Sequence, residues 1–122
     1  MFKRKRATII VKTPKGILLV SNLILGKFMF ALPGGGIKFR ENPEISTRRE
    51  LQEETSLVIK KIKFLFNFKG RLHNHFVFEA QVSGVPKKSW ETRHFVYYND
   101  KVRIEKTHKK IIEKYLMLNK NN

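Results

Sequence analysis

The chain has 122 residues, a length that suits one compact domain, and its 41% of hydrophobic residues is enough for a core and excludes overall disorder. The sequence contains no cysteine, which excludes disulfides, thiolate metal sites and a cysteine nucleophile, and no apolar run reaches the roughly 20 residues that span a membrane. The formal net charge of +16 favours polyanionic partners, no secretion signal is expected after the basic start, and the absence of cysteine fits a cytoplasmic protein.

The first third of the chain predicts short strands. Residues 7–11 and 16–20 are apolar on either side of a turn at 14–16, so we expect a hairpin. A third strand is expected over residues 28–32, and it runs into the glycine run at residues 33–36.

The segment 43–55 is predicted to be a helix, because it has no glycine and begins with Pro43, which the first helical turn tolerates. Residues 57–68 and 75–80 then alternate between apolar and polar side chains, which is the period of strands with one buried face. A further strand is expected over residues 92–98. The alternation predicts a buried face of Ile62, Phe64, Phe66, Phe68, Phe76, Phe78 and Ala80, with His75, Val77 and Glu79 on the other face.

The C-terminal segment predicts a second helix. Apolar residues from Ile104 to Leu116 recur at helical spacing with Lys and Glu between them, which is typical of an amphipathic helix. No repeat or linker interrupts the chain, so we expect one domain over residues 1–122. The order of strands, helix, strands and helix indicates an α/β protein with a mixed β-sheet between helices.

The acidic residues of this basic chain are concentrated in the predicted middle helix. Residues 1–40 contain no Asp or Glu, and five of the ten acids lie between Glu41 and Glu54. Glu50 lies three residues before Glu53 and four before Glu54, so a helix places these three carboxylates on one side. Such acids repel one another unless cations compensate, and carboxylate oxygens suit hard cations such as Mg²⁺ or Mn²⁺. The alternative interpretation is an ordinary solvated helix face.

The glycine run before this helix adds a second feature. Glycine lets the backbone approach a ligand or a metal closely, although most such runs are plain turns. From Gly35 the chain continues with five residues, Glu41, seven residues, and then Arg49-Glu50-Leu51-Gln52-Glu53-Glu54-Thr55-Ser56-Leu57. This arrangement over residues 35–57 resembles the Nudix box, the signature of the Nudix hydrolases, which are MutT-like pyrophosphohydrolases. Every specified position matches except Ser56, which stands where the family has glycine.

The resemblance implies a fold and an activity. The fold is an α-β-α sandwich, and the activity is metal-dependent hydrolysis of the phosphoanhydride bond in a nucleoside diphosphate linked to another group X. Among such substrates we expect a nucleoside tri- or polyphosphate, because the short chain carries no extension for recognising a sugar or NADH. The positions that match the family's metal-binding groups are Gly35, through its backbone carbonyl, Glu50, Glu53 and Glu54.

Two further positions match supporting residues of the family. Arg49 matches the arginine that orients the glutamates by ion pairing, and Glu41 matches the acid that anchors the loop to the helix. The general base is Glu50 or Glu53, since family members differ. Magnesium or manganese ions neutralise pyrophosphate charge and lower the pKa of water, so this chemistry needs no Ser, Cys or His nucleophile.

The departure at Ser56 predicts only a small effect. Glycine at this position would end the helix in a left-handed conformation, which costs serine about 1 kcal/mol. The position takes no part in the chemistry, so we expect a small effect on stability or on the loop and an active enzyme.

Several residues outside the box are further candidates. Glu79 and Glu91 could supply an extra metal ligand or a base, and their alternative is a surface acid on or near a strand. Trp90, in a loop-like stretch, is the aromatic residue that we would test for stacking on a base. His73 and His75 are too few to hold a metal by themselves.

The excess of Lys and Arg leaves two interpretations open. The first is a solvated surface, and the second is a groove for RNA or polyphosphate. The second would make the protein an RNA 5′-end pyrophosphohydrolase, or a non-catalytic module that uses the same fold to bind nucleotides or RNA. Nudix proteins are often dimers, so a homodimer is also an open alternative. The basic residues concerned are Lys3 to Arg6, Lys60, Lys61, Lys63, Lys87, Lys88, Lys106, Lys109 and Lys110.

Overall fold

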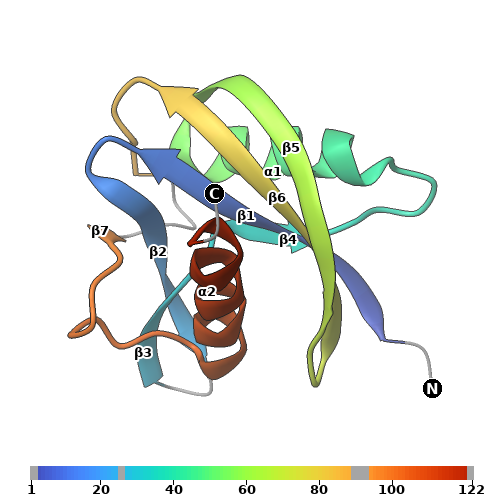
Figure 1. Cartoon of the computed structure of the whole chain (residues 1–122). Coiled ribbons are helices and arrows are strands. Elements are labelled where there is room, and N and C mark those ends of the chain that lie inside the picture. Colours follow the sequence, from blue (N-terminus) through green and yellow to red (C-terminus); the bar gives the residue numbers. More distant parts are fainter. Residues whose placement is uncertain (1–2, 25–26, 89–93, 121–122) are drawn as a thin grey trace.

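The computed structural model describes residues 3–24, 27–88 and 94–120, and these residues form a twisted sheet with two helices (Figure 1). The helix predicted over residues 43–55 is confirmed, with the same bounds. In chain order the elements are β1 (Arg4–Thr13), β2 (Gly16–Ile24), β3 (Lys27–Ala31), β4 (Gly34–Gly36), α1 (Pro43–Thr55), β5 (Val58–Lys69), β6 (His73–Ser83), β7 (Phe95–Tyr97) and α2 (Lys106–Asn119).

The sheet is mixed, as the order of elements predicts. Its strands run in the order β3-β2-β1-β6-β5, with β4 paired to β1 and β7 paired to β2. The central strands β1 and β6 are parallel over Arg4–Lys12 and His73–Gln81, and the other pairings are antiparallel. The antiparallel pair β1–β4 brings the glycine run beside the first strand, which fixes the loop that precedes α1.

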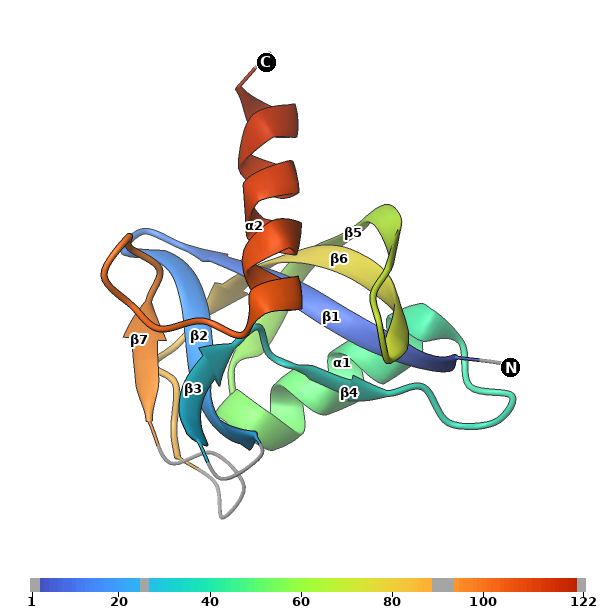
Figure 2. The ribbon, with the colours of Figure 1, turned by 90° about the horizontal axis from the view of Figure 1, so that it is seen from below.

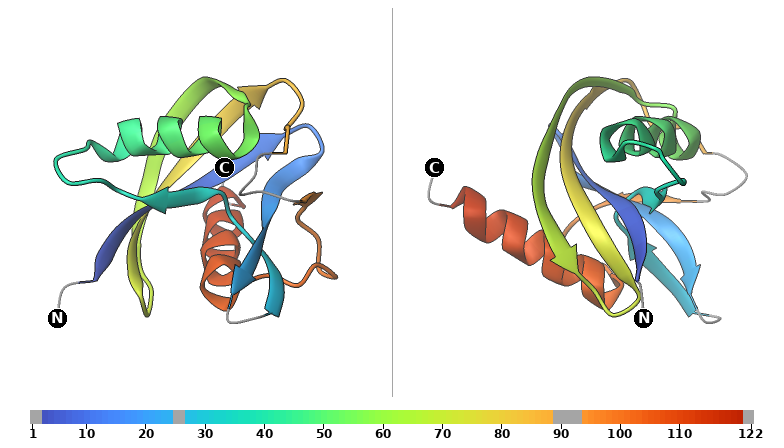
Figure 3. Two further views of the ribbon diagram at one scale, coloured as in Figure 1. Left: turned by 180° about the vertical axis from the view of Figure 1, so that it is seen from behind. Right: turned by 90° about the vertical axis from the view of Figure 1, so that its right-hand side faces the viewer.

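The two helices cover opposite faces of the sheet, which is the α-β-α arrangement that the resemblance implies. Figure 2 and the right-hand view of Figure 3 show α1 on one side and α2 on the other. Successive side chains of β1 point to opposite faces of the sheet, so Ile9 and Ile10 belong to different hydrophobic cores. The α1 core is Ile9, Val11, Leu18, Leu51, Leu57 and Ala80. The α2 core is Ile10, Ile17, Leu19, Leu32, Val77, Ile104, Ile111, Ile112 and Tyr115.

Both ends of α1 follow from local sequence. The Asn42 side chain caps the helix by accepting the Glu44 N–H at 2.7 Å, and Pro43 occupies the first turn, where no N–H is needed. The helix ends at Ser56, which has φ 60° and ψ 15° and whose N–H donates to the Gln52 carbonyl at 3.0 Å. Ser56 therefore adopts the left-handed conformation that the family's glycine would adopt.

The structure adds one strand to those predicted and shows that two predictions about strands were wrong in part. The added strand is β4, in which Gly34 to Gly36 pair with β1. A register shift in β5 between Phe64 and Phe66 breaks the alternation, and Phe64 is 49% exposed. The face of β6 that was expected to be polar is also covered, and His75 is buried, because β6 is an interior strand with a helix on each side. Neither helix that the structure describes is long and apolar enough to cross a membrane.

Candidate active site

Strand β4 and helix α1 meet where Gly35 faces Glu50. A side-chain carbon placed on Gly35 would overlap the carboxylate of Glu50, so any larger residue here would displace the Glu50 side chain. Gly35 pairs with Ala7 of β1, which fixes its backbone from the other side. The Glu50 side chain is only 13% exposed, so a carboxylate lies directly against a strand whose backbone is held in place.

Arg49 connects this contact to the loop before the helix. Its Nε and Nη2 donate to the two carboxylate oxygens of Glu41 at 3.0 and 2.9 Å, and its Nη1 donates to Glu50 at 2.7 Å. The hydrogen bonds from Arg49, and next that from Ser46, lower the pKa of Glu41 from 4.5 to about 2. The hydrogen bond with Glu41 in turn raises the pKa of Arg49 above its ordinary value. The guanidinium thus fixes Glu50 and ties α1 to the loop at Glu41.

The other two glutamates of α1 differ in how they are held. Glu54 accepts the Gly34 N–H at 2.8 Å, which joins the helix to the start of β4. Gly34 has φ +150°, and a side-chain carbon there would overlap the Ala7 carbonyl, so this position requires glycine. Glu53 lies 3.6 Å from Arg49 Nη1, and its side chain is 52% exposed. Glu53 is therefore the carboxylate of the three with the most access to solvent.

The segment that leads into β4 is held by residues of β1 and α2. The Leu32 N–H donates to Nδ1 of His108 at 3.0 Å, and the Leu32 carbonyl accepts Nη2 of Arg6 at 3.3 Å. The next carbonyl, that of Pro33, accepts the Ile9 N–H at 2.9 Å. Burial is the main reason that the pKa of His108 is lowered, so the imidazole is neutral at pH 7. Its Nδ1 can therefore accept the hydrogen bond from the Leu32 N–H.

A polar pocket of about 200 Å³ opens beside Glu54. Arg6 and Glu54 are its charged lining residues. The remaining lining residues are Val20, Ser21, Ala31, Leu32 and Gly34. The pocket therefore lies between Glu54 of α1, the glycine run, β1 and β2.

The residues of the site fit a hard divalent cation by their chemistry. Their donors are carboxylate oxygens, together with a backbone that Gly35 brings against Glu50. In the described part of the chain, no three acidic or histidine side chains are already gathered around one point that could hold a metal ion. The carboxylates are instead held by Arg49 and by the Gly34 N–H, close to one another along α1.

The predicted residues outside the box lie elsewhere or cannot be placed. Glu79 accepts the Tyr115 hydroxyl at 2.6 Å on the α2 side of the sheet, and burial followed by this hydrogen bond raises the pKa of Tyr115 to about 12. The structure thus does not bring Glu79 to the glutamates of α1. Glu91 and Trp90 lie outside the described residues, so their predicted roles stay predictions.

Arg6 and His108 were not recognised as site residues from the sequence. Arg6 was grouped with the basic surface, whereas the structure leaves Lys3, Arg4 and Lys5 exposed and buries Arg6 in part. The alternation of β1 was the available signal, because it puts Arg6 on the same face as Thr8 and Ile10. His108 meets Leu32 across 76 residues of sequence, and no local pattern indicates such a contact.

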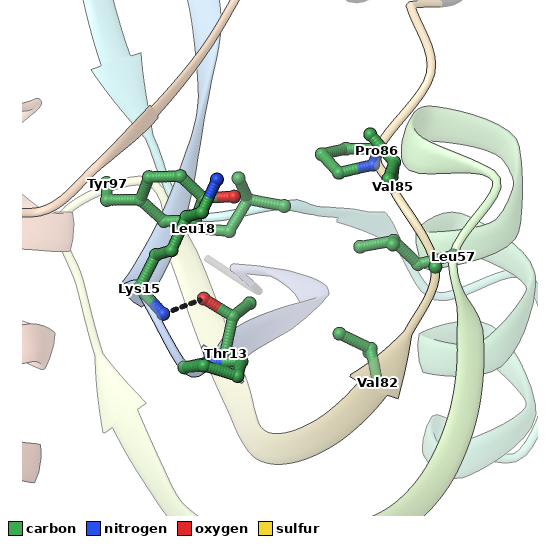
Figure 4. Close-up of a pocket in the computed structure, with 10 residues that line it drawn as sticks. Thr13, Lys15, Leu18, Leu57, Val82, Val85, Pro86 and Tyr97 are labelled. Carbon is green, nitrogen blue, oxygen red and sulfur yellow. Dashed lines mark hydrogen bonds between the residues drawn. The ribbon is translucent and has the colours of Figure 1, made fainter.

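A second pocket, of about 210 Å³, lies beyond the C-terminal end of α1 (Figure 4). It is mainly apolar, with Leu57 and Val82 on one side and Tyr97 on the other. Lys15 is the charged residue in its lining, and none of the residues of the Arg49 network reaches it. This pocket therefore lacks the carboxylates that the predicted chemistry requires.

Comparison with known proteins identifies the family. The family model of the NUDIX domain matches residues 2–115. The structure of a nudix hydrolase family member from Chromobacterium violaceum is similar with 25% identity and a TM-score of 0.86, covering 96% of this chain and 79% of that one. A MutT NUDIX hydrolase from Burkholderia pseudomallei matches with 17% identity and a TM-score of 0.80, over 93% of this chain and 98% of that one. A UDP-X diphosphatase, also 17% identical, matches with a TM-score of 0.75 over 99% and 64% of the two chains.

Proposed function

The chain belongs to the Nudix family of pyrophosphohydrolases, and we propose that it hydrolyses the phosphoanhydride bond of a nucleoside diphosphate linked to another group X. A nucleoside tri- or polyphosphate is the substrate class that we propose first. The observation that carries the proposal is the contact of Gly35 with the Glu50 carboxylate, which Arg49 holds in place. The proposal is also supported by a polar pocket of about 200 Å³, which is lined by Gly34 and Glu54, the neighbours of this contact on β4 and α1.

We infer that Mg²⁺ or Mn²⁺ is held by Glu50, Glu53 and Glu54, with the Gly35 carbonyl as a further oxygen donor. A bound divalent cation supplies neutralisation of the phosphate charge and a water molecule of lowered pKa. The chemistry of the donors supports this inference, because hard cations of this kind select carboxylate and carbonyl oxygens. The two glycines support it as well, because they let the backbone of β4 approach the carboxylates of α1.

The chain's own residues then divide the work of the reaction. Arg49 holds Glu50 against β4 and prevents its rotation, since the same guanidinium is fixed by two hydrogen bonds to Glu41. Glu50 or Glu53 takes the proton of the attacking water. The greater exposure of Glu53 favours it for this task, because its carboxylate meets solvent directly. Arg49, Glu50 and Glu53 are thus the proposed catalytic set.

The test is release of phosphate or pyrophosphate from a panel of nucleotides with Mg²⁺ or Mn²⁺. The panel contains nucleoside triphosphates, dinucleoside polyphosphates, ADP-ribose and, because of the similarity to a UDP-X diphosphatase, UDP-linked sugars. We expect turnover of at least one nucleotide, loss of turnover with EDTA, and a fall of at least about 100-fold in Glu53→Gln/Glu54→Gln.

A matched control for this panel is Glu44→Gln, which removes an acid from the exposed first turn of the same helix, where it pairs with Arg48. We expect the turnover of Glu44→Gln to stay within about twofold of wild type, because surface ion pairs contribute little. Absence of turnover on every member of the panel would contradict the proposed function.

RNA is a second candidate substrate because exposed lysines accompany the net charge of +16. Lys60, Lys61 and Lys63 are exposed on β5, an edge strand, and Lys109 and Lys110 are exposed on α2. An RNA with a 5′-triphosphate therefore belongs in the panel, assayed at several salt concentrations. Tight, salt-sensitive RNA binding without any turnover would instead indicate a binding module. A cytoplasmic location and a homodimer stay predictions.

A further inference from the structure

Arg6 is a partly buried arginine whose guanidinium is only in part satisfied. Its Nη1 donates to Thr8 Oγ1 at 3.1 Å, and its Nη2 donates to the Leu32 carbonyl at 3.3 Å. A guanidinium carries five N–H donors, and the other three have no acceptor among the residues that the structure describes. Both acceptors in use are neutral oxygens, so neither balances the positive charge.

The guanidinium lies beside Gly34 and shares a pocket with Glu54 of α1. A side-chain carbon on Gly34 would come within 3.0 Å of Arg6 Nη1, so the absence of a side chain there leaves room for the guanidinium. The same Gly34 donates its N–H to Glu54 at 2.8 Å. Arg6 and Glu54 both line the pocket of about 200 Å³, with Gly34 between them.

No carboxylate of the described chain approaches Arg6 closely enough to form an ion pair of 4 Å or less. Burial lowers the pKa of Arg6 below its usual value. The negative charges of the more distant Glu54, Glu50 and Glu105 act in the opposite direction, with Glu54 having the largest effect of the three. A buried cation without a close counter-ion is costly unless an anion joins it.

The three histidines around Arg6 are neutral at pH 7. Burial and the charge of Arg6 lower the pKa of His75 to about 4, and the same causes lower the pKa of His73 and of His108. Arg6 is therefore the positive group that the described lining presents to the pocket.

The charge balance of Arg6 changes with the occupancy of the α1 site. Glu54 is the carboxylate that most favours the charged form of Arg6, and a cation held by Glu54 would neutralise that influence. An oxyanion that enters together with the cation restores the balance, and the open N–H donors of Arg6 match the oxygens of a phosphate. Cation and oxyanion are thus expected to favour each other's binding at this site.

We propose that Arg6 is a substrate-binding residue, whose guanidinium binds a phosphate oxyanion of the pyrophosphate group held at the α1 glutamates. This inference rests on the proposed function, because it takes the α1 site to be the place where the substrate's phosphates lie. The ligand that we assign to the pocket between β1, the glycine run and Glu54 is therefore an oxyanion of the pyrophosphate type.

The test is calorimetric titration of inorganic pyrophosphate into the protein with Mg²⁺. We expect Arg6→Met to raise the Kd for pyrophosphate by about tenfold or more, as expected when a charge-assisted hydrogen bond is lost. Arg6→Lys keeps the charge without the planar fork of donors, so we expect an intermediate Kd. The matched control is Arg4→Met, which removes the same charge from an exposed position of the same strand and leaves the Kd within about twofold.

The same data distinguish substrate binding by Arg6 from a purely positioning role through its hydrogen bond to the Leu32 carbonyl. Such a role would lower thermal stability or turnover in Arg6→Met and leave the Kd for pyrophosphate unchanged, which overturns the inference. Failure of the wild-type protein to bind pyrophosphate with Mg²⁺ overturns it as well. Neither result depends on turnover, so nucleotide hydrolysis by the wild-type protein still decides the proposed function separately.

A second measurement uses the wild-type protein alone and so does not depend on the folding of a variant. In the wild-type protein, the NMR signal of the Arg6 side-chain Nε–H can be assigned through its own side-chain carbons. We expect this signal to shift and to be protected from exchange when pyrophosphate is added with Mg²⁺, while that of Arg4 stays unchanged. An Arg6 signal that does not respond to saturating pyrophosphate overturns the inference.

Discussion

The two helices on either side of the sheet use their buried faces in different ways. Helix α2 buries His108, Ile111, Ile112 and Tyr115, and apolar side chains dominate its contact with the α2 core. Helix α1 buries Ser46, Thr47, Leu51 and Thr55, three of which are small hydroxyl residues. The Thr47 and Thr55 hydroxyls donate to carbonyls one turn earlier in the helix, at 2.9 and 2.7 Å, so these buried groups are satisfied locally.

The difference shows that polar contacts, rather than a periodic apolar face, can fix the position of a helix on a sheet. With small side chains underneath, α1 lies close enough to β4 for Glu50 to meet Gly35 and for Glu54 to meet the Gly34 N–H. Its position is then fixed by charged and polar contacts, above all by Arg49, Glu41 and Glu50. Substitutions in α2 should therefore lower stability, and substitutions in the polar network of α1 should lower activity first.

The largest effect on stability is expected in α2. Ile112 is fully buried in the α2 core, so Ile112→Ala should lower the free energy of unfolding by about 3 kcal/mol through lost burial and a cavity. The measurement is urea unfolding, with Leu116→Ala as the control, because Leu116 lies on the same helix and is 42% exposed. Equal losses for the two variants would contradict the assigned role of α2.

A smaller effect is expected from the network of α1. Glu41→Gln removes the carboxylate that fixes Arg49, and we expect turnover to fall by about tenfold while the chain stays folded. The Glu41 pKa is lowered to about 2 in the folded state, so its stabilisation is present above pH 4.5 and is lost as the pH falls toward 2.

The pH dependence gives this prediction a separate readout. The difference in Tm between wild type and Glu41→Gln should shrink as the pH is lowered from about 5 to about 2, because wild-type Glu41 becomes protonated over that range. A difference in Tm that stays constant across this range would show that the carboxylate charge of Glu41 does not anchor α1.

The smallest effect is expected where α1 ends. Ser56→Gly should raise the free energy of unfolding by about 0.5–1 kcal/mol, because relief of left-handed strain outweighs the extra backbone entropy of glycine. Turnover should stay within about twofold of wild type, since the exposed Ser56 makes no contact with the glutamates. An increase in turnover by orders of magnitude would contradict a purely conformational role.

The elements specified by neighbouring residues could be predicted from the sequence. Helix α1 was predicted with the observed bounds because Pro43 and the glycine-free segment after it act locally, and the box indicated Gly35, Glu41, Arg49 and the glutamates. Their proximity follows from that spacing, and the left-handed Ser56 follows from the family's glycine. The roles assigned to these residues in metal binding and catalysis stay predictions.

The features that depend on distant pairing could not be predicted. The contact of His108 with Leu32 and that of Thr8 with His75 join residues 76 and 67 positions apart, so no local pattern announces them. The register shift at Phe64 arises from pairing with β6, and alternation within β5 alone could not show it. The partly buried place of Arg6 could not be predicted because most of its neighbours, such as Leu32, Gly34, Glu54 and His75, are distant in the sequence.

The central claim is that the glutamates of α1 hold divalent cations, and binding of Mn²⁺ tests it most directly. Titration of Mn²⁺ followed by electron paramagnetic resonance should show binding to the wild-type protein and to Glu44→Gln. In Glu50→Gln/Glu53→Gln we expect Mn²⁺ affinity to fall by at least about tenfold while the Tm is maintained. Unchanged Mn²⁺ affinity in that folded double variant would contradict the account.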